Sequence, residues 1–266
     1  MSDAERLPVR VLLADAEQAS RTAMGEAIAE AHPGAAVDTA RNGRELFDRL
    51  QQHTYDVLVL DTILSDVDVP KLMKVLAVVR ARRAMRLILL VDRLKPTWTQ
   101  LGQGLQAYDV LLKPLRHEVV VRTCAACFES LRPRALLLAD ASVRARRLVQ
   151  KIVDESQFAA FVTEAETGRL ALRHIRRHVF DLALVDFALP DMPALEVASR
   201  ILARGDDVTQ VLMMGDDPDR CRGLAVFGIQ GFLEKPFGAL LLDDCLHRTL
   251  GLWRPYLSKA LQPTAA

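Results

Sequence analysis

The sequence predicts an α/β fold in which two tandem domains each hold a five-stranded parallel sheet inside an α/β/α sandwich. One observation is an internal repeat, because the motifs around two aspartates and one lysine of the first half recur in the second half. A second is that each copy alternates short β-branched or leucine-rich runs with longer segments of helical period, which is typical of a parallel sheet covered by helices. The third is the length of 266 residues, which suits two domains.

Three residue pairs mark the repeat. They are Asp15 and Asp140, Asp61 and Asp186, and Lys113 and Lys235. Both aspartate pairs are separated by 125 residues and the lysine pair by 122, as the differences between their numbers show. We therefore expect domains at residues 7–131 and 134–250, joined through a short Arg-Pro-Arg segment, and a tail at residues 251–266.

The strands and helices are placed by hydrophobic period. In the first copy we expect strands at 9–14, 35–40, 56–61, 86–91 and 109–112, and helices near 18–31, 43–53, 69–83, 96–106 and 116–131. In the second copy we expect strands at 135–140, 158–163, 181–186, 208–214 and 230–233, and helices near 143–155, 168–178, 194–204, 218–227 and 238–250. Each copy thus has five β/α units.

Composition argues against several classes of function. The 35 Lys and Arg residues nearly balance the 34 Asp and Glu residues, so the net charge of +1 provides no general attraction to nucleic acid or to a membrane surface. The first residues lack the pattern of a secretory signal, and no apolar run is long enough to span a bilayer. We expect a cytoplasmic protein that is not an enzyme and has no separate output domain after residue 250.

The four cysteines are expected to be reduced packing residues. Cys124 and Cys127 form a C-x-x-C motif, but they follow an apolar run on an expected helix and share one face of it, whereas a reactive thiolate belongs at a helix start. Cys221 and Cys245 supply no second pair with the spacing of a zinc site.

Acidic and basic side chains follow the expected strands at the ends where a parallel sheet collects its ligands. Asp15, Asp61 and Lys113 each stand at or just after the carboxyl end of a strand, and their three counterparts do the same in the second copy. Two carboxylates and one ammonium at a sheet edge suit an aspartate that accepts a phosphoryl group: one carboxylate attacks, the other helps to hold Mg²⁺, and the lysine neutralises phosphate charge.

These motifs resemble the receiver domains of two-component response regulators, which have a flavodoxin-like fold. The resemblance covers residues 7–131 and 134–250 and implies that Asp61 and Asp186 are phosphoacceptors. It also implies that the Lys-Pro pairs at 113–114 and 235–236 have cis peptide bonds. Asn42-Gly43 and Thr167-Gly168 match the start of the family's second helix.

The chain departs from the family pattern at three places in the first copy and at two in the second. The second of two adjacent acids, which in the family binds metal directly, is replaced by Ala16 and Ala141. The hydroxyl residue expected at the end of the fourth strand is replaced by Val91 in the first copy and by Gly215 in the second, and neither can donate a side-chain hydrogen bond. The aromatic switch residue is Val110 in the first copy and Phe232 in the second. Two candidate metal ligands remain in each copy: Asp15 with Asp61, and Asp140 with Asp186. The loss of the second acid makes Mg²⁺ binding at these residues doubtful.

One acid is gained in each acidic pocket. Asp92 and Asp216 directly follow Val91 and Gly215. We consider three alternatives: these carboxylates are relocated Mg²⁺ ligands, they pair with Lys113 and Lys235, or they face water. Like charges about 4 Å apart repel by roughly 4 kcal/mol at an effective dielectric constant near 20, so three clustered acids need a cation, a lysine or a proton.

The leading functional prediction is a signalling protein that presents receiver surfaces to other proteins. Its switch would be phosphorylation at Asp186 or, less favourably, Asp61, with a histidine kinase or phosphotransfer protein as donor and a downstream signalling protein as target. The alternative is a phosphorylation-independent scaffold or dimerisation module. The sequence leaves open whether the protein forms a homodimer. Trp98 and Tyr108 lie in the fourth and fifth units, through which receiver domains often associate. The arginine-rich segment 169–177 is either a solvated helix face, which the sequence favours, or a docking site for an acidic protein.

Overall fold

The computed structural model describes residues 8–66, 76, 85–93, 102, 104–105, 107–156, 159–204, 209–217, 219 and 223–252. Contacts between Cα atoms divide the chain into two compact units. The boundary between the first unit and the second unit lies between Glu129 and Ser130, and the second unit ends at Leu252.

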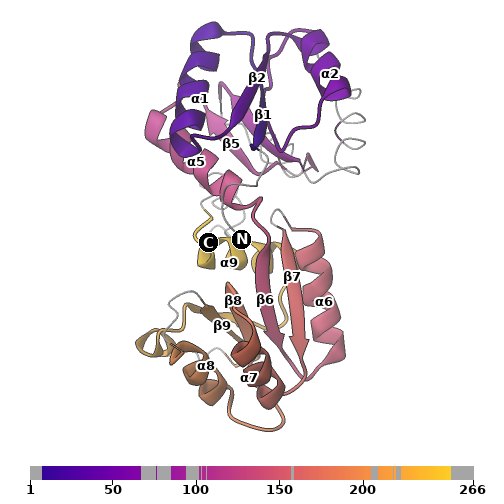
Figure 1. Cartoon of the computed structure of the whole chain (residues 1–266). Helices are drawn as coiled ribbons and strands as arrows, with labels where there is room; N and C mark the ends of the chain where they lie inside the picture. The colour runs from indigo at the N-terminus through magenta and orange to yellow at the C-terminus, as the bar shows by residue number, and fades with distance from the viewer. Residues whose placement is uncertain are drawn as a thin grey trace. The chain divides into compact units, whose positions relative to one another are not determined.

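The first unit has a parallel sheet with the strand order β2-β1-β3-β4-β5. Helices α1 and α5 lie side by side on one face of this sheet, and α2 lies on the other (Figure 1). The described elements are β1 (Arg10–Ala14), α1 (Gln18–Ala31), β2 (Ala36–Ala40), α2 (Gly43–Gln52), β3 (Val57–Asp61), β4 (Arg86–Val91), β5 (Asp109–Leu112) and α5 (His117–Glu129).

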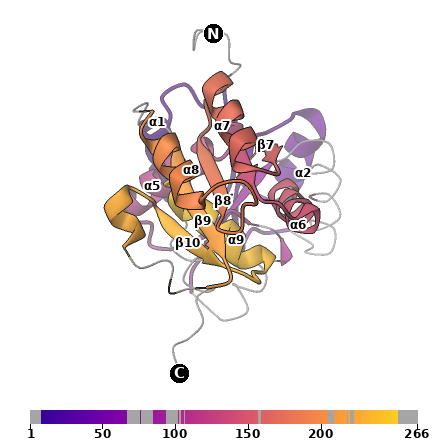
Figure 2. The same cartoon turned by 90° about the horizontal axis from the view of Figure 1, so that it is seen from below.

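The second unit repeats this architecture, with the order β10-β9-β8-β6-β7. Helices α7 and α8 contact each other on one face of the sheet, and α6 and α9 contact each other on the opposite face (Figure 2). The elements are β6 (Arg134–Ala139), α6 (Val143–Asp154), β7 (Ala160–Ala165), α7 (Gly168–Arg177), β8 (Leu182–Asp186), α8 (Ala194–Leu202), β9 (Gln210–Gly215), the 3₁₀ helix η3 (Leu224–Phe227), β10 (Gly231–Glu234) and α9 (Ala239–Thr249).

Both sheets have the doubly wound order expected for flavodoxin-like domains. Their central strands are buried on both faces, as the near-continuous apolar runs predict: every residue of β3 and of β8 is buried. Alternate residues of each strand face opposite helix layers. In the first unit, for example, Leu12 and Leu58 pack with Leu46 of α2 in one apolar cluster.

The second helix of each unit begins where its capping residue predicts. The Asn42 side chain accepts a hydrogen bond from the backbone N–H of Glu45 at 2.9 Å, and α2 begins at Gly43. The Thr167 hydroxyl accepts one from Leu170 N–H at 3.2 Å, and α7 begins at Gly168. Such bonds satisfy amide groups that have no partner inside the helix.

The structure alters two of the predicted elements. The strand expected at 158–163 is β7, Ala160–Ala165, because its register pairs Ala160 with Arg134 at the start of β6. Within the helix expected at 218–227, the structure describes residues 219 and 223–227, and Leu224–Phe227 form the 3₁₀ helix η3, bounded by Gly223 and Gly228 at φ 80° and 77°. Left-handed backbone of this kind ends regular helices. Most of the helices expected at 69–83 and 96–106 lies outside the described residues, as does Trp98.

Across the described part of the chain, no helix combines the length and the apolar character needed to cross a bilayer.

Candidate functional site at the carboxyl edge of each sheet

The structure brings the predicted acids and lysine of each copy together. In the first unit, Asp15 directly follows β1, Asp61 ends β3 and Lys113 directly follows β5. Strands β1 and β3 are neighbours, whereas β5 lies two strands from β3, so the long lysine side chain has to reach across β4. The parallel arrangement places all three residues at the same edge of the sheet.

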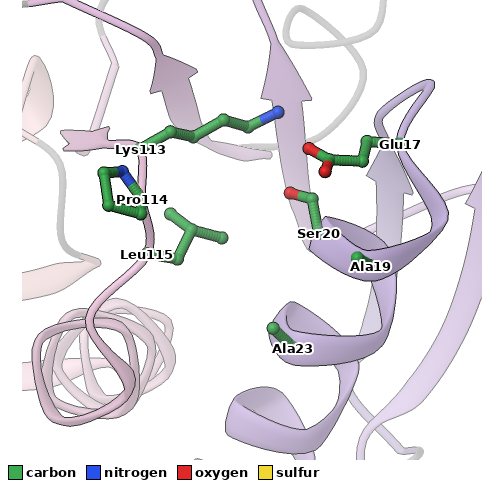
Figure 3. A pocket seen from close by; sticks show the side chains of 7 residues that line it. All are labelled: Glu17, Ala19, Ser20, Ala23, Lys113, Pro114 and Leu115. Atoms are coloured by element: carbon green, nitrogen blue, oxygen red, sulfur yellow. The ribbon is translucent and has the colours of Figure 1, made fainter.

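In the first unit the lysine ammonium bridges both carboxylates. Lys113 Nζ lies 2.6 Å from Asp61 Oδ2 and 2.8 Å from Asp15 Oδ2. The residue Asp15 is 0% exposed and Asp61 is 6% exposed. Removing two anions from water is costly unless they are paired, and this ammonium supplies the pairing. Lys113 extends from the end of β5 toward the start of α1, where Ser20 and Glu17 line the same small pocket of about 200 Å³ (Figure 3).

Asp15 has two further hydrogen-bond donors. Ser20 Oγ donates to Asp15 Oδ2 at 2.6 Å, and the backbone N–H of Glu17 donates to Oδ1 at 2.8 Å. Burial acts to raise the pKa of Asp15, but the hydrogen bonds from Lys113, Ser20 and Glu17 outweigh it and lower the pKa. For Lys113, burial acts to lower the pKa, and the bonds to both aspartates outweigh it and raise the pKa. The first site therefore holds an ionised carboxylate and an ammonium together.

The second unit forms the same bridge. Lys235 Nζ lies 2.6 Å from Asp140 Oδ2 and 3.0 Å from Asp186 Oδ2. Burial acts to lower the pKa of Lys235, and its hydrogen bonds to the two aspartates raise it overall. Asp140 accepts a bond from the backbone N–H of Ser142 at 2.7 Å, but Ala145 stands where the first copy has Ser20, so the hydroxyl donor is missing.

The two phosphoacceptor candidates differ in how many bonds they make. Asp61 Oδ1 accepts the backbone N–H of Ile63 at 2.9 Å, while Oδ2 binds the lysine. For Asp186, the described residues provide the contact with Lys235 and no other hydrogen bond. Within the described residues one oxygen of Asp186 thus accepts no hydrogen bond, whereas both oxygens of Asp61 accept one.

An arginine in each copy supports the loop that carries the first aspartate, and the sequence analysis missed it. Arg21 Nη1 donates to the backbone oxygens of Asp15 at 2.7 Å and Ala16 at 2.9 Å. Arg146 Nη1 does the same for Asp140 at 2.8 Å and Ala141 at 3.3 Å. The two arginines are 125 residues apart, like the aspartates, so extending the repeat comparison by six residues would have revealed them.

Asp92 and Asp216 stay outside the bridges. Both side chains are exposed, and the contacts of the lysines within the described structure are with Asp15, Asp61, Asp140 and Asp186 instead. The predicted alternative of pairing with the lysines is therefore wrong. Each acid directly follows the last residue of its strand and has an exposed side chain, while the lysine of the same unit is bound by the two buried aspartates. Of the three alternatives, exposure to water agrees with the structure.

The described residues do not form a ready ligand set for Mg²⁺. They include no group of three or more His, Cys, Asp or Glu side chains that could hold a metal ion. Ala16 and Ala141 occupy the positions of the missing acid, and the two carboxylates that each unit retains already bind a lysine. Mg²⁺ prefers several oxygen ligands in octahedral geometry, which two lysine-bound carboxylates do not offer.

The end of the fourth strand is closed by apolar groups in both units. Val91 is 0% exposed and packs in the core of the first unit. In the second unit, a Cβ atom at Gly215 would lie 3.1 Å from Phe187 Cδ2 and 3.4 Å from Phe232 Cε2. The two rings contact each other, with centroids 6.1 Å apart. Among the described residues, the space beside Gly215 is thus filled by two aromatic rings.

Two further expectations are confirmed. The bonds Lys113–Pro114 and Lys235–Pro236 are cis, as the family resemblance implied. Cys124, Cys127 and Cys245 are buried and free, and burial raises the pKa of Cys124 to about 12, so its thiol stays protonated. Cys221 lies outside the described residues.

Tyr108 is 0% exposed and is therefore unavailable as an interface residue.

Comparison with known proteins agrees with this geometry. The family model of the response regulator receiver domain matches residues 11–124 and 136–246. The chemotaxis protein CheY of Listeria monocytogenes is 32% identical over 120 residues, which cover 42% of this chain and 95% of that protein, and CheY of Listeria innocua matches equally.

Solved structures show the same fold over nearly the whole chain. A probable two-component system response regulator/GGDEF domain protein superposes with a TM-score of 0.66 at 19% identity, over 91% of this chain and 98% of that chain. A second response regulator/GGDEF domain protein superposes with a TM-score of 0.65 at 17% identity, over 92% and 99%. At these identities the likeness concerns the fold.

Proposed function

Because the chain belongs to the response regulator receiver domain family, with two copies of that domain, we propose that it acts in phosphorelay signalling and that Asp186 is its principal phosphoacceptor. Asp61 is the second candidate. The observation that carries the proposal is the lysine that bridges two buried aspartates at the carboxyl edge of each sheet. We expect the protein to transmit a state to partner proteins and not to turn over a substrate.

The proposed reaction is a transfer of a phosphoryl group to a carboxylate. An oxygen of Asp186 attacks phosphorus, the bond from phosphorus to the donor's leaving group breaks, and an acyl phosphate forms. Lys235, whose pKa is raised by its two aspartate partners against the effect of burial, carries the positive charge that neutralises the added phosphate. The donor is a phosphohistidine of a kinase or phosphotransfer protein, or a small acyl phosphate.

Phosphorylation would change the surface that a downstream protein recognises. In a two-state domain the phosphoryl group favours one arrangement, and the partner binds that arrangement more tightly. Gly215 offers no hydroxyl to the phosphoryl group, and the Phe187 and Phe232 rings fill its side. We therefore propose weak coupling between phosphorylation and conformation in the second unit.

Intact-mass measurement after incubation with acetyl phosphate and Mg²⁺ tests the phosphoacceptor. We expect one added phosphoryl group on the full chain and on Asp61→Asn, and none on Asp186→Asn. An adduct that persists in Asp186→Asn and disappears in Asp61→Asn would transfer the role to Asp61. The absence of any adduct, also with a phosphorylated histidine phosphotransfer domain as donor, would refute the proposal.

A phosphorylation-independent binding module is the second candidate, and the first unit favours it. All four carboxylate oxygens of Asp15 and Asp61 accept hydrogen bonds, from Lys113, Ser20 and the backbone amides of residues 17 and 63. This network makes the oxygens of Asp61 less nucleophilic than an oxygen that accepts no hydrogen bond. If the first unit is a scaffold, Asp61→Asn will leave the binding of its partner unchanged. If the first unit is a phosphorylation switch, Asp61→Asn will abolish that binding.

A further inference from the structure

Helix α7 presents a stripe of arginines on the second unit. Arg169, Arg173, Arg176 and Arg177 are all exposed. Their spacing of four, three and one residues keeps them on neighbouring parts of one helix face, and at 1.5 Å per residue the stripe is about 12 Å long. The helix is placed on the same face of the sheet as α8 (Figure 2).

The fold itself does not require three of these four charges, because Arg169 alone has an arginine at the matching position of the first unit, Arg44. Helix α2 occupies the equivalent place in the first unit, and its residues at the positions of Arg173, Arg176 and Arg177 are Asp48, Gln51 and Gln52. Both helices bury the same kind of apolar face against their sheet. The same helix therefore forms with mixed charge in one unit and with positive charge alone in the other.

Within the described residues the stripe has little compensating negative charge. Arg169 Nε lies 3.9 Å from Asp191 Oδ2, but Arg173, Arg176 and Arg177 have no ion pair within the described structure. Like charges three or four residues apart destabilise a helix by tenths of a kcal/mol, and the helix dipole favours cations in the last turn alone. The dipole thus accounts for Arg176 and Arg177 but not for Arg169 and Arg173, which stand earlier in the helix.

Exposed apolar side chains lie beside the C-terminal end of the stripe. Phe161 of β7 is 71% exposed and Val179, two residues after α7, is 53% exposed. In the register of the sheet Phe161 is paired with Ala135, which packs in the cluster on the α7 side, so Phe161 points to that side. Because α7 runs antiparallel to the strands, its C-terminal end lies near the start of β7.

We propose that the α7 stripe, together with Phe161 and Val179, is a docking surface for an acidic segment of a partner protein that carries an apolar anchor. Arginine and aromatic side chains together are typical of energetic centres in protein interfaces, and guanidinium groups bind carboxylates in bidentate geometry. A nucleic acid fits less well, because the whole chain has a net charge of +1 and the basic surface occupies one helix.

Fluorescence anisotropy with the full chain tests this surface. The probe is a labelled synthetic 12-residue peptide of glutamates with two central phenylalanines. We expect Arg173→Glu with Arg177→Glu to weaken its binding by about tenfold or more, and Phe161→Ser by about threefold. The matched control is Arg144→Glu with Arg147→Glu, which changes the same charge at exposed positions of α6 and is expected to stay within about twofold of the wild type.

Two outcomes would overturn the proposal. One is equal binding by the α7 variant and the α6 control, which would reduce the attraction to net charge. The other is a labelled DNA duplex that binds more tightly than the peptide and loses binding in the α7 variant, which would make the stripe a nucleic-acid site. Circular dichroism of each variant verifies that it is folded, and the exposure of all four arginines leads us to expect that it is.

Discussion

Replacing Lys113 by methionine removes the cation that holds the first acidic site together. Its Nζ atom lies 2.6 and 2.8 Å from the two Oδ2 atoms, which therefore cannot be more than about 5.4 Å apart, the sum of these distances. At that separation and an effective dielectric constant near 20, two carboxylates repel by about 3 kcal/mol. We expect Lys113→Met to lower the free energy of unfolding of the first unit by about this amount at pH 7.

The pH dependence distinguishes this cause from simple loss of packing. Without Lys113, burial of Asp15 is less well opposed and its pKa rises. A carboxyl group whose folded-state pKa is raised destabilises the fold increasingly as the pH rises from its unfolded-state pKa to its folded-state pKa. The loss should therefore shrink as the pH falls and Asp15 takes up a proton. Asp61→Asn added to Lys113→Met should recover much of the stability at pH 7, because it removes one of the two like charges.

Urea unfolding, monitored by hydrogen exchange in peptides that contain β1 and β3, reports on the first unit separately from the second. The measurement is made at pH 7 and pH 5 on the wild type, Lys113→Met and the double variant. A loss that is equal at both pH values, or a double variant that is less stable than Lys113→Met, would refute the electrostatic reasoning.

Three other predictions concern single positions. Gly168→Ala should lower the thermal stability of the second unit by about 1–3 kcal/mol in calorimetry, because its Cβ would lie 2.8 Å from Cγ2 of the buried Val197; unchanged melting would contradict this contact. Because the pKa of Asp15 is lowered, its ionised form stabilises the first unit at pH values above the ordinary pKa of 3.8, and this stabilisation is lost as the pH falls. In Asp15→Asn the free energy of unfolding of the first unit should therefore depend less steeply on pH in the acid range. Ala141→Asp should raise the Mg²⁺ affinity, measured by calorimetric titration, on the order of tenfold, because it restores an acid. Asp216→Ala should leave the affinity unchanged, and a lower affinity in that variant would support Asp216 as a Mg²⁺ ligand.

Much of the site was predictable because parallel strands place their carboxyl ends at one edge. Once the repeat and the strand positions were recognised, Asp15, Asp61 and Lys113 had to lie near one another, since each follows a strand of the same sheet. The repeat supplied an independent check, because the same three residue types recur with the same order. The cis bonds before Pro114 and Pro236 were implied by family resemblance and not by the residues alone.

The direction of loop side chains was not predictable in the same way. Asp92 and Asp216 stand next to strand ends, like the site aspartates, yet both face solvent. Position along the chain places a residue near the sheet edge, but the backbone path of the following loop decides where its side chain points. The same limit explains why the sequence did not predict that Ser20, in the first turn of α1, donates a hydrogen bond to Asp15.

The sequence by itself determined the two domains, their α/β class and the residue types at the edge of each sheet, because hydrophobic period and strand order act over short stretches of chain. Only the tertiary structure decided which atoms bond there: Lys113 lies 52 residues from Asp61, and Lys235 lies 95 from Asp140. It also decided that two aromatic rings close the space beside Gly215. Such contacts join segments that local pattern does not relate, and the packing of the whole domain sets their distances.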